Sequence, residues 1–279
     1  MSNALIFDIK RGSTSDGPGL RTVVFFQGCN LNCAWCHNPE GKAARPQLAK
    51  FSQKCTGCKS CEKACDEFHL SCQKACGKCV ERCPNGALKL FGKSVPVQDI
   101  LQTVLADDPY YAATGGGVTF SGGECMLQID AVKQLAAACK NRGVSVAVDT
   151  AGHLPYEYFQ MLAPFVDLYL FDVKAYSPKT HEQYVGVDNG LILDNLRRLL
   201  KENRRVWVRI PVVQGVNDSV QEMQKIKAFL DECGTPERVE LLPYHALGED
   251  KAVALGMPVQ RFSAPSAETL GLLKAVFDN

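Results

Sequence analysis

Short apolar runs and longer amphipathic segments alternate along the chain from residue 97 onward. Apolar residues recur at helical spacing in five segments, which predicts helices at 97–106, 129–141, 191–203, 220–233 and 267–277. Runs rich in branched residues predict strands at 118–120, 144–148, 166–173, 206–213 and 239–242. Strands that alternate with helices predict an α/β protein with a parallel sheet and right-handed crossovers.

Two more strand-like runs precede this region, at 5–9 and 22–26, and the turn sequence Ser15-Asp16-Gly17-Pro18-Gly19 separates them. With 22–26 included, the alternating pattern contains six strands, which predicts an incomplete barrel rather than a full eight-stranded one. In such sheets the chemistry gathers where the strands end, so polar motifs at those positions are candidate site residues.

Composition narrows the class of protein. The 279 residues are 46% hydrophobic and 22% charged, with a formal net charge of +1, as in an ordinary globular protein with a sizeable core. Near-neutral charge argues against a nucleic-acid or polybasic membrane surface. No apolar run approaches the ~18 residues of a membrane-spanning helix, and the first residues lack the apolar region of a signal peptide. We therefore expect a cytoplasmic protein.

Fourteen cysteines are the unusual feature, and all except Cys125, Cys139 and Cys233 lie between residues 29 and 83. A disulfide scaffold is normally short and secreted, which this chain is not. Gaps of two or three residues between cysteines instead suit loops around a metal centre. We therefore expect metal ligands in the cluster, and small packing residues at the three outlying positions.

The cysteines also divide the chain into three parts. We expect residues 1–48 to form the first part of the core and residues 93–279 to form the remainder. Between them, residues 49–92 are polar, rich in Cys, Lys and Gly, and poor in aliphatic side chains. Such an insert cannot build a large apolar core and would need metal to fold.

The first cysteine set, Cys29, Cys33 and Cys36, directly follows the first core strand. Three thiolates cannot complete a four-iron cluster, which takes four ligands, so one iron would stay open for a substrate. A zinc site with a fourth ligand elsewhere, such as His37, is the alternative on spacing alone.

Cys-x-x-x-Cys-x-x-Cys after the first strand resembles the radical S-adenosylmethionine (SAM) superfamily. Together with Asp16-Gly17-Pro18-Gly19-Leu20-Arg21 and the segment 33–40, it resembles the activating enzymes of glycyl-radical enzymes, such as pyruvate formate-lyase activase. Further matching segments follow in the same order at 115–124, 149–152, 172–174, 208–213 and 241–245. The resemblance implies a partial (β/α)6 radical SAM barrel with a small inserted ferredoxin-like domain that holds two clusters.

The resemblance also implies roles for residues. It places the catalytic cluster on Cys29, Cys33 and Cys36, and puts Asp16 and Arg209 on the substrate side. It implies a monovalent cation beside the carboxylate of SAM, near Asp149, Thr150 and Asp172. The cofactor-binding residues it implies are Trp35, Cys36, His37, Gly122, Gly123, Glu124, Asp149, Thr150, Asp172, Val173, Lys174 and His245.

Each of these residues also has a purely structural interpretation. The Gly122-Gly123-Glu124 segment also fits a plain turn, and it is not a P-loop because no Gly-Lys-Ser/Thr follows it. Asp149 or Asp172 alone also fits a helix N-cap, and Asp16 fits a turn residue. A single His is more often structural than functional, and a single Lys or Arg is more often a solvated charge.

The insert contains the bacterial ferredoxin run, in which the fourth cysteine serves the other cluster. The pairing we expect puts Cys55, Cys58, Cys61 and Cys83 on one [4Fe–4S] cluster, and Cys65, Cys72, Cys76 and Cys79 on the other. Two zinc knuckles are the alternative. One extra residue between Cys72 and Cys76 departs from the usual run and loosens the second loop.

The resemblance therefore implies an anaerobic oxidoreductase with three [4Fe–4S] clusters. SAM would be cleaved reductively to a 5′-deoxyadenosyl radical, which would take hydrogen from a backbone glycine of a partner enzyme. A flavodoxin- or ferredoxin-like donor would supply the electron, and we expect a monomer with no nucleic-acid or membrane partner. Two alternatives remain from the residues: another radical SAM enzyme that acts on a small molecule or peptide, and a non-enzymatic ferredoxin-like electron-transfer protein.

Overall fold

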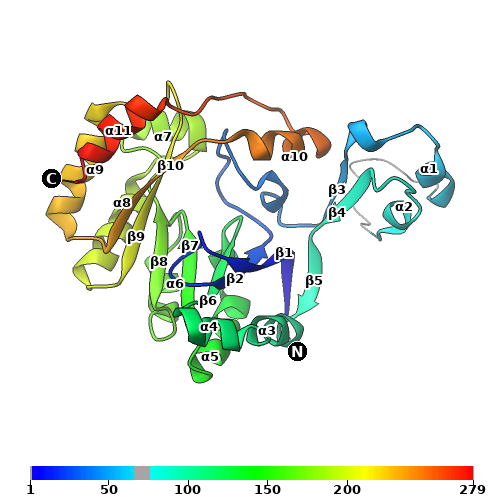
Figure 1. Cartoon of the computed structure of the whole chain (residues 1–279), viewed down its shortest axis with the longest axis horizontal. Helices are drawn as coiled ribbons and strands as arrows, with labels where there is room; N and C mark the ends of the chain where they lie inside the picture. Colours follow the sequence, from blue (N-terminus) through cyan, green and yellow to red (C-terminus); the bar gives the residue numbers. More distant parts are fainter. Residues whose placement is uncertain (1, 66–75, 279) are drawn as a thin grey trace.

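A computed structural model describes residues 2–65 and 76–278, so Cys72, expected as a cluster ligand, lies outside the described residues. The strands of the main sheet are β1 (Asn3–Ser13), β2 (Arg21–Phe26), β5 (Lys93–Pro96), β6 (Gly117–Gly122), β7 (Ser145–Thr150), β8 (Leu168–Asp172), β9 (Val206–Val212) and β10 (Arg238–Pro243). Their order is β10-β9-β8-β7-β6-β2-β1-β5 (Figure 1).

The sheet is mostly parallel, as the sequence pattern predicts. Every neighbouring pair from β2 to β10 runs parallel. β1 pairs antiparallel with β2, because the turn at Asp16-Gly17-Pro18-Gly19 reverses the chain directly between them. β5 pairs antiparallel with β1 and was not expected, since its four residues, two of them exposed, give no apolar run.

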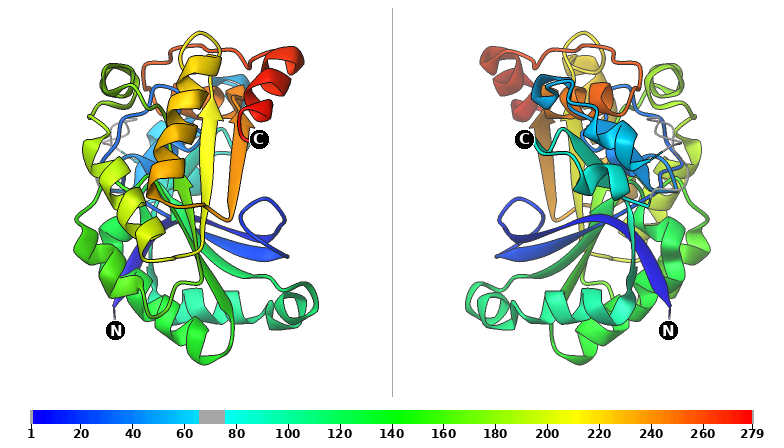
Figure 2. Two further views of the ribbon diagram at one scale, coloured as in Figure 1. Left: turned by 90° about the vertical axis from the view of Figure 1, so that its left-hand side faces the viewer. Right: turned by 90° about the vertical axis from the view of Figure 1, so that its right-hand side faces the viewer.

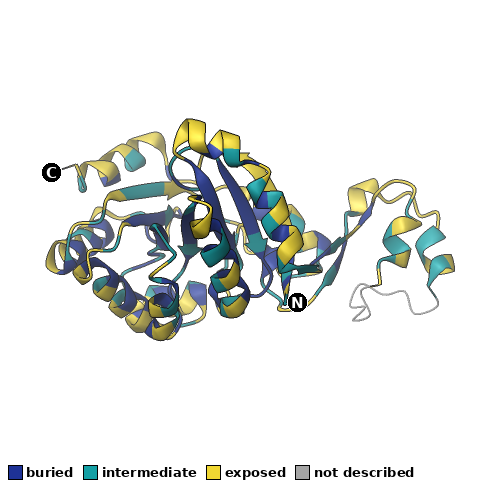
Figure 3. Ribbon diagram, turned by 90° about the horizontal axis from the view of Figure 1, so that it is seen from below, coloured by how far each residue is buried: buried dark blue, intermediate teal, exposed yellow. Residues whose placement is uncertain are grey.

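Helices connect the parallel strands. They are α3 (Val97–Leu105), α4 (Asp108–Thr114), α5 (Ile129–Asn141), α6 (Tyr156–Leu162), α7 (Pro178–Val185), α8 (Gly190–Lys201), α9 (Val220–Cys233), α10 (Glu249–Ala254) and α11 (Ala267–Ala275). Figure 2 shows helices along the outside of the sheet, and Figure 3 shows that the strands beside them are largely buried. The bounds predicted for α5 and α9 are confirmed. The short α4, α6, α7 and α10 were missed because so few residues carry no readable period.

The main core lies between the sheet and these helices. Valines and phenylalanines of the strands pack against apolar residues of α5, α8 and α9. Cys125, Cys139 and Cys233 are buried in this same core, which confirms them as packing residues. None of the helices in the described part of the chain has the length and apolar character needed to cross a bilayer.

The cysteine-rich segment leaves the core on a two-stranded stem. β3 (Gln47–Lys50) pairs antiparallel with β4 (Leu88–Phe91). Between them lie η2 (Ser52–Lys54), α1 (Ser60–Ala64) and α2 (Lys78–Glu81), none of which contains a buried residue. Figure 1 shows this segment projecting from the side of the sheet away from the C-terminus.

Candidate active site

A loop after β2 carries Cys29, Cys33 and Cys36, and three backbone contacts fix its path. The amides of Asn32 and Ala34 donate to the carbonyls of Val185 and Tyr184 at the end of α7, at 2.9 and 2.8 Å. The amide of Cys29 donates to the carbonyl of Lys42 at 3.0 Å, just past η1 (Pro39–Gly41). Backbone hydrogen bonds to α7 and to the segment after η1 therefore hold the loop in place.

The three thiols lie in surroundings that disfavour a free thiolate. Burial raises the pKa of Cys29 to about 12 and of Cys36 to about 11, and it raises the pKa of Cys33 as well. Cys33 and Cys36 add to the upward shift of the Cys29 pKa, so the thiols lie close enough to interact. Binding a soft metal centre would release their protons.

The chemistry of this donor set fits an iron–sulfur cluster, since three soft thiols lie in one loop. The Leu31 amide donates to Cys29 Sγ at 3.4 Å, the kind of N–H···S contact that stabilises a ligating sulfur. Over the described residues, no three His, Cys, Asp or Glu side chains already converge as a metal site.

The glycines that end β6 bring that strand directly against the cysteine loop. The Gly123 amide donates to the Phe26 carbonyl at 2.9 Å, and the Glu124 amide donates to the Gly28 carbonyl at 2.7 Å. A Cβ on Gly123 would lie 2.3 Å from Gly28 O and 2.4 Å from Gly41 O. Glycine at this position is thus required for two backbones to meet.

Glu124 joins the ends of β6 and β7. It is 1% exposed, and its Oε2 accepts from Thr150 Oγ1 at 2.8 Å and from the Ala151 amide at 3.1 Å. Burial raises the Glu124 pKa to about 7, although these hydrogen bonds act to lower it. Thr150 Oγ1 in turn accepts from the Gly152 amide at 2.9 Å. Both residues, expected to face the cofactor, make structural contacts with protein groups here.

Charged residues line the face of the sheet opposite the helices. Side chains alternate along a strand, so Asp149 lies on the same face of the sheet as Ala147, and Asp172 on the same face as Leu170. Ala147 and Leu170 belong to a small apolar cluster apart from the main core. Asp149 accepts from Ser121 Oγ at 2.7 Å. Burial raises the Asp149 pKa to about 6, partly offset by the charge of Arg209.

Lys174 lies directly after β8 and contacts Asp172, with Nζ 2.6 Å from Oδ2. Burial alone would lower the Lys174 pKa, but Asp172 and the sulfurs of Cys33 and Cys29 together raise it far above its usual value. Lys174 therefore stays protonated between an acidic strand end and the cysteine loop.

Arg209 ties the first turn of the chain to this face. Its Nη2 donates to the Ser15 carbonyl at 2.6 Å, and its Nε donates to Glu240 at 3.3 Å, while Nη1 lies 3.7 Å from Asp149. Thr119 Oγ1 donates to the Asp16 carbonyl at 2.6 Å. The structure thus brings together Asp16 and Arg209, which are far apart in sequence.

The expected aromatic and histidine contacts divide into two groups. Trp35 packs against Tyr184 and Phe262, each with ring centroids 6.0 Å away, and is largely buried. The rings of His37 and His245 meet edge to face at 4.2 Å. Burial, followed by the charges of His245 and Lys251, lowers the His37 pKa to about 4, so His37 is neutral at physiological pH.

Val173 faces the core, while its amide donates to the Arg209 carbonyl at 2.8 Å. Two residues that sequence reasoning missed support this region. Asn217 donates to the Lys174 and Pro211 carbonyls at 2.8 and 2.7 Å, and Lys42 Nζ donates to the Cys33 carbonyl at 2.9 Å. The Gly-Val-Asn-Asp turn after β9 could have signalled Asn217; an isolated lysine gives no signal.

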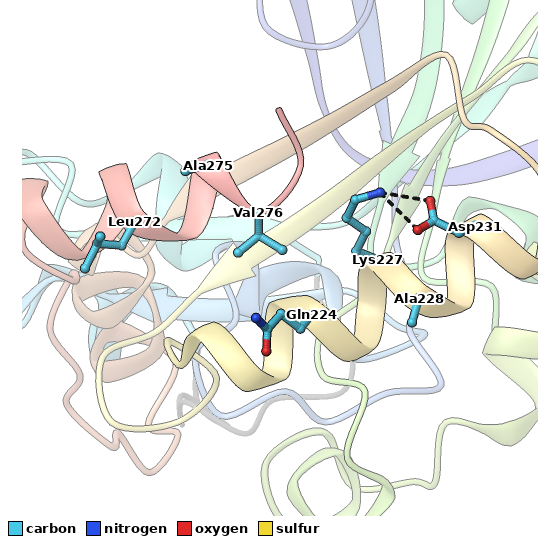
Figure 4. A pocket seen from close by; sticks show the side chains of 7 residues that line it. All are labelled: Gln224, Lys227, Ala228, Asp231, Leu272, Ala275 and Val276. Atoms are coloured by element: carbon cyan, nitrogen blue, oxygen red, sulfur yellow. Dashed lines mark hydrogen bonds and ion pairs between the residues drawn. The ribbon is translucent and has the colours of Figure 1, made fainter. Parts of the chain in front are cut away.

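In the described part of the chain, two hollows exceed the volume of about 280 Å³ of a third one beside Arg11 and Asp107. A cavity of about 550 Å³ lies between the cysteine loop and the segment after β10, and its lining includes Cys29, Cys36, Lys42 and His245. A crevice of about 420 Å³ lies between α9 and α11, lined by Gln224, Lys227, Ala228, Asp231, Leu272, Ala275 and Val276 (Figure 4). None of the residues that line the crevice is an expected site residue, whereas the lining of the cavity includes several of them.

Comparisons with known proteins show the family to which the chain belongs. Residues 23–226 match the radical SAM superfamily. The chain is 37% identical to the (2S)-3-sulfopropanediol dehydratase activating enzyme of Klebsiella oxytoca, over 91% of this chain and 86% of that protein. It is also 37% identical to the choline trimethylamine-lyase activating enzyme of Oleidesulfovibrio alaskensis, over 91% and 87% of the respective chains.

Solved structures show the same fold. A domain of a pyruvate-formate lyase-activating enzyme from Bacteroides vulgatus is 30% identical, with a TM-score of 0.51 over 58% of this chain and 93% of that one. SuiB of Streptococcus suis, solved with its precursor peptide SuiA, has a TM-score of 0.57 over 92% of this chain and 44% of that one. At 12% identity, SuiB supports the fold alone.

Proposed function

The chain belongs to the radical SAM superfamily and, within it, to the activating enzymes of glycyl-radical enzymes, and we propose that it generates a glycyl radical in a partner enzyme. It is an enzyme of the radical SAM oxidoreductase type, and its family implies an iron–sulfur cluster and SAM. In the proposed reaction, one electron cleaves SAM to methionine and a 5′-deoxyadenosyl radical, which takes a hydrogen atom from a backbone glycine and leaves as 5′-deoxyadenosine.

One observation carries this proposal: the three-cysteine loop lies against the strand ends that hold the charged residues. Glu124 follows the glycines that touch the loop, and Lys174 lies near Cys33 and Cys29. Cys29, Cys33 and Cys36 would hold the catalytic cluster. The residues proposed for SAM are Trp35, Cys36, His37, Gly122, Gly123, Glu124, Asp149, Thr150, Asp172, Val173, Lys174 and His245.

We further propose that Asp149, Thr150 and Asp172 hold a monovalent cation. Carboxylate oxygens are ligands for hard cations, and the two carboxylates end neighbouring strands on one face of the sheet. The Thr150 hydroxyl already contacts Glu124 and Gly152, so Thr150 would contribute its backbone carbonyl. Arg209 and Lys174 already compensate part of this negative charge. A singly charged ion therefore suits the balance better than a doubly charged one.

The parallel strands would form a partial (β/α)6 barrel that admits a loop of the partner. Asp16 and Arg209 would face that loop, since Arg209 holds the turn next to Asp16 against the polar sheet face. The two relatives are named as activating enzymes of a dehydratase and of a lyase, so the family alone does not fix the chemistry of the partner. The enzyme would act as a cytoplasmic monomer that receives its electron from a flavodoxin- or ferredoxin-like donor.

Residues 49–92 would form a ferredoxin-like domain between core segments 1–48 and 93–279. Two observations support the proposed pairing of its cysteines. Burial is the largest cause of the raised Cys79 pKa, and the charges of Cys65 and Cys76 raise it further. These three cysteines therefore lie close together, as one cluster requires. Asn85 Nδ2 donates to Thr56 Oγ1 at 2.9 Å, which brings the chain beside Cys55 next to the chain beside Cys83.

The test is anaerobic reconstitution followed by reduction with dithionite in the presence of SAM. Three clusters predict about twelve irons per chain and formation of 5′-deoxyadenosine. In Cys33→Ser the iron count should fall by about four and 5′-deoxyadenosine should disappear, because the catalytic cluster loses a ligand. Cys139→Ser, in the buried core, is the matched control and should keep both. Reduced wild-type enzyme that forms no 5′-deoxyadenosine would contradict the proposal.

A further inference from the structure

The short helix α10 contacts both cysteine-bearing parts of the molecule. It has only six residues, too few for stability of its own, so tertiary contacts must hold it. Figure 1 shows it above the loop that follows β2, with its far end near the stem of the insert.

At its start, α10 lies on the cysteine loop. Gly248 precedes the helix, and a Cβ on this residue would lie 2.2 Å from the Cys36 carbonyl oxygen, so the two backbones touch. Tyr244 Oη donates to Glu249 Oε1 at 2.7 Å, which anchors the first turn of the helix to the end of β10. The first turn is thus placed directly over a proposed cluster ligand.

At its other end, α10 packs on the stem that carries the insert. Ala254 is 3% exposed and forms a small apolar cluster with Ala49 of β3 and Phe91 of β4. Phe51 and Leu255 pack against the same cluster. The helix therefore spans from the catalytic loop to the base of the cluster-bearing insert.

An ion pair fastens the middle of α10 to the segment just past Cys36. Lys251 Nζ donates to Glu40 Oε1 at 2.7 Å and to Asn38 Oδ1 at 3.3 Å. Glu40 is 4% exposed, and within the described residues its Oε2 has no hydrogen-bond donor. A buried carboxylate depends strongly on its cation, because removal of one partner leaves an uncompensated buried charge.

We propose that Lys251 is a positioning residue whose ion pair with Glu40 pins α10 across the cysteine loop and the stem, and so sets how the catalytic cysteines lie relative to the insert. The effect of this position on electron transfer from the insert to the catalytic cluster rests on the proposed function. The role of the ion pair in holding α10 does not. Neither residue would touch SAM or a cluster.

The test compares Lys251→Met with Lys227→Met in the reconstituted enzyme. Lys227 pairs with Asp231 on α9, where Asp231 is exposed (Figure 4), so it controls for loss of a lysine ion pair. Amide hydrogen exchange in residues 36–42 and 246–255 should rise roughly tenfold in Lys251→Met, because the pin no longer holds these segments closed. It should stay unchanged in Lys227→Met.

Glu40→Gln breaks the same pair from the other side and should raise exchange in the same residues. If the two side chains act through each other, Lys251→Met combined with Glu40→Gln should be no worse than either single variant. Lys251→Arg keeps the charge and should restore slow exchange. The EPR signal of the reduced catalytic cluster should change in Lys251→Met and return in Lys251→Arg.

Unchanged exchange in both Lys251→Met and Glu40→Gln would overturn the proposal that this ion pair holds α10 in place. Additive effects of the two substitutions would also overturn it. These outcomes are separate from failure of the proposed function, which would appear as absence of 5′-deoxyadenosine from the wild-type enzyme while the exchange comparison still decides the role of Lys251.

Discussion

The cysteines of the core and those of the insert lie in opposite surroundings. Cys33 is 8% exposed in a loop that backbone hydrogen bonds fasten on two sides. Cys55, Cys58 and Cys76 are exposed, and no residue of the insert helices α1 and α2 is buried. Burial raises the Cys33 pKa, whereas a hydrogen bond with Ser60 lowers that of Cys58. The core therefore holds its thiols by packing, while the insert depends on what its thiols bind.

Removal of iron should produce the largest difference between the two regions. Without metal, amides in 51–65 and 76–87 should exchange at close to unprotected rates, because these residues bury too little apolar surface to stay folded. Amides of β6 to β9, within the main core, should remain protected. Hydrogen exchange with mass spectrometry on chelated and reconstituted enzyme measures both; a protected insert in the chelated enzyme would contradict the comparison.

Within the core, Arg209→Met should cause the next largest loss. It leaves Asp149 without its buried cation, removes one of the two arginines that pair with Glu240 and frees the Ser15 carbonyl, which should cost about 3–5 kcal/mol of unfolding free energy. Denaturant unfolding of the metal-free chain measures this. Arg205→Met is the matched control, since its pair with Glu237 is largely exposed and should contribute about 0–1 kcal/mol.

Gly123→Ala should disturb the catalytic loop and leave the insert intact. The new methyl group would overlap the Gly28 and Gly41 carbonyls, at a cost of about 1–3 kcal/mol. Iron should fall from about twelve toward about eight per chain, because only the catalytic cluster is affected. Gly271→Ala is the control, because nothing lies within 4 Å of a Cβ at this position in α11. Equal iron loss in both variants would refute the distinction.

The smallest effect concerns the pH dependence of the core. Glu124 has a pKa raised by burial from 4.5 to about 7, so the folded chain binds a proton more tightly than the unfolded chain. This contribution is complete below pH 4.5 and is lost as the pH rises through 7, which amounts to about 1 kcal/mol between pH 6 and pH 8. Denaturant midpoints of the metal-free chain should fall accordingly, and Glu124→Gln should show a shallower slope. Equal slopes would rule out Glu124 as the source.

Much of the core could be predicted because its strands are nearly continuous apolar runs and its long helices have clear periods. The patterns alone predict the strands β2, β6, β7, β8, β9 and β10 and the helices α5 and α9. The missed elements, such as β5 and α10, are short and take their structure from neighbours: β5 pairs with β1, and α10 rests on Cys36 and Ala49. Local sequence carries too little free energy to specify them.

By itself, the sequence determined the cysteine loop, the motifs at the strand ends and the order in which they occur, because ligand spacing and periodicity are local properties. Only the tertiary structure decided which side chains meet. It tied Glu124 to Thr150, Arg209 to Ser15 and Lys251 to Glu40. These contacts join residues distant in sequence, and the compensation of buried charge that they provide exists only when the sheet brings the strand ends together.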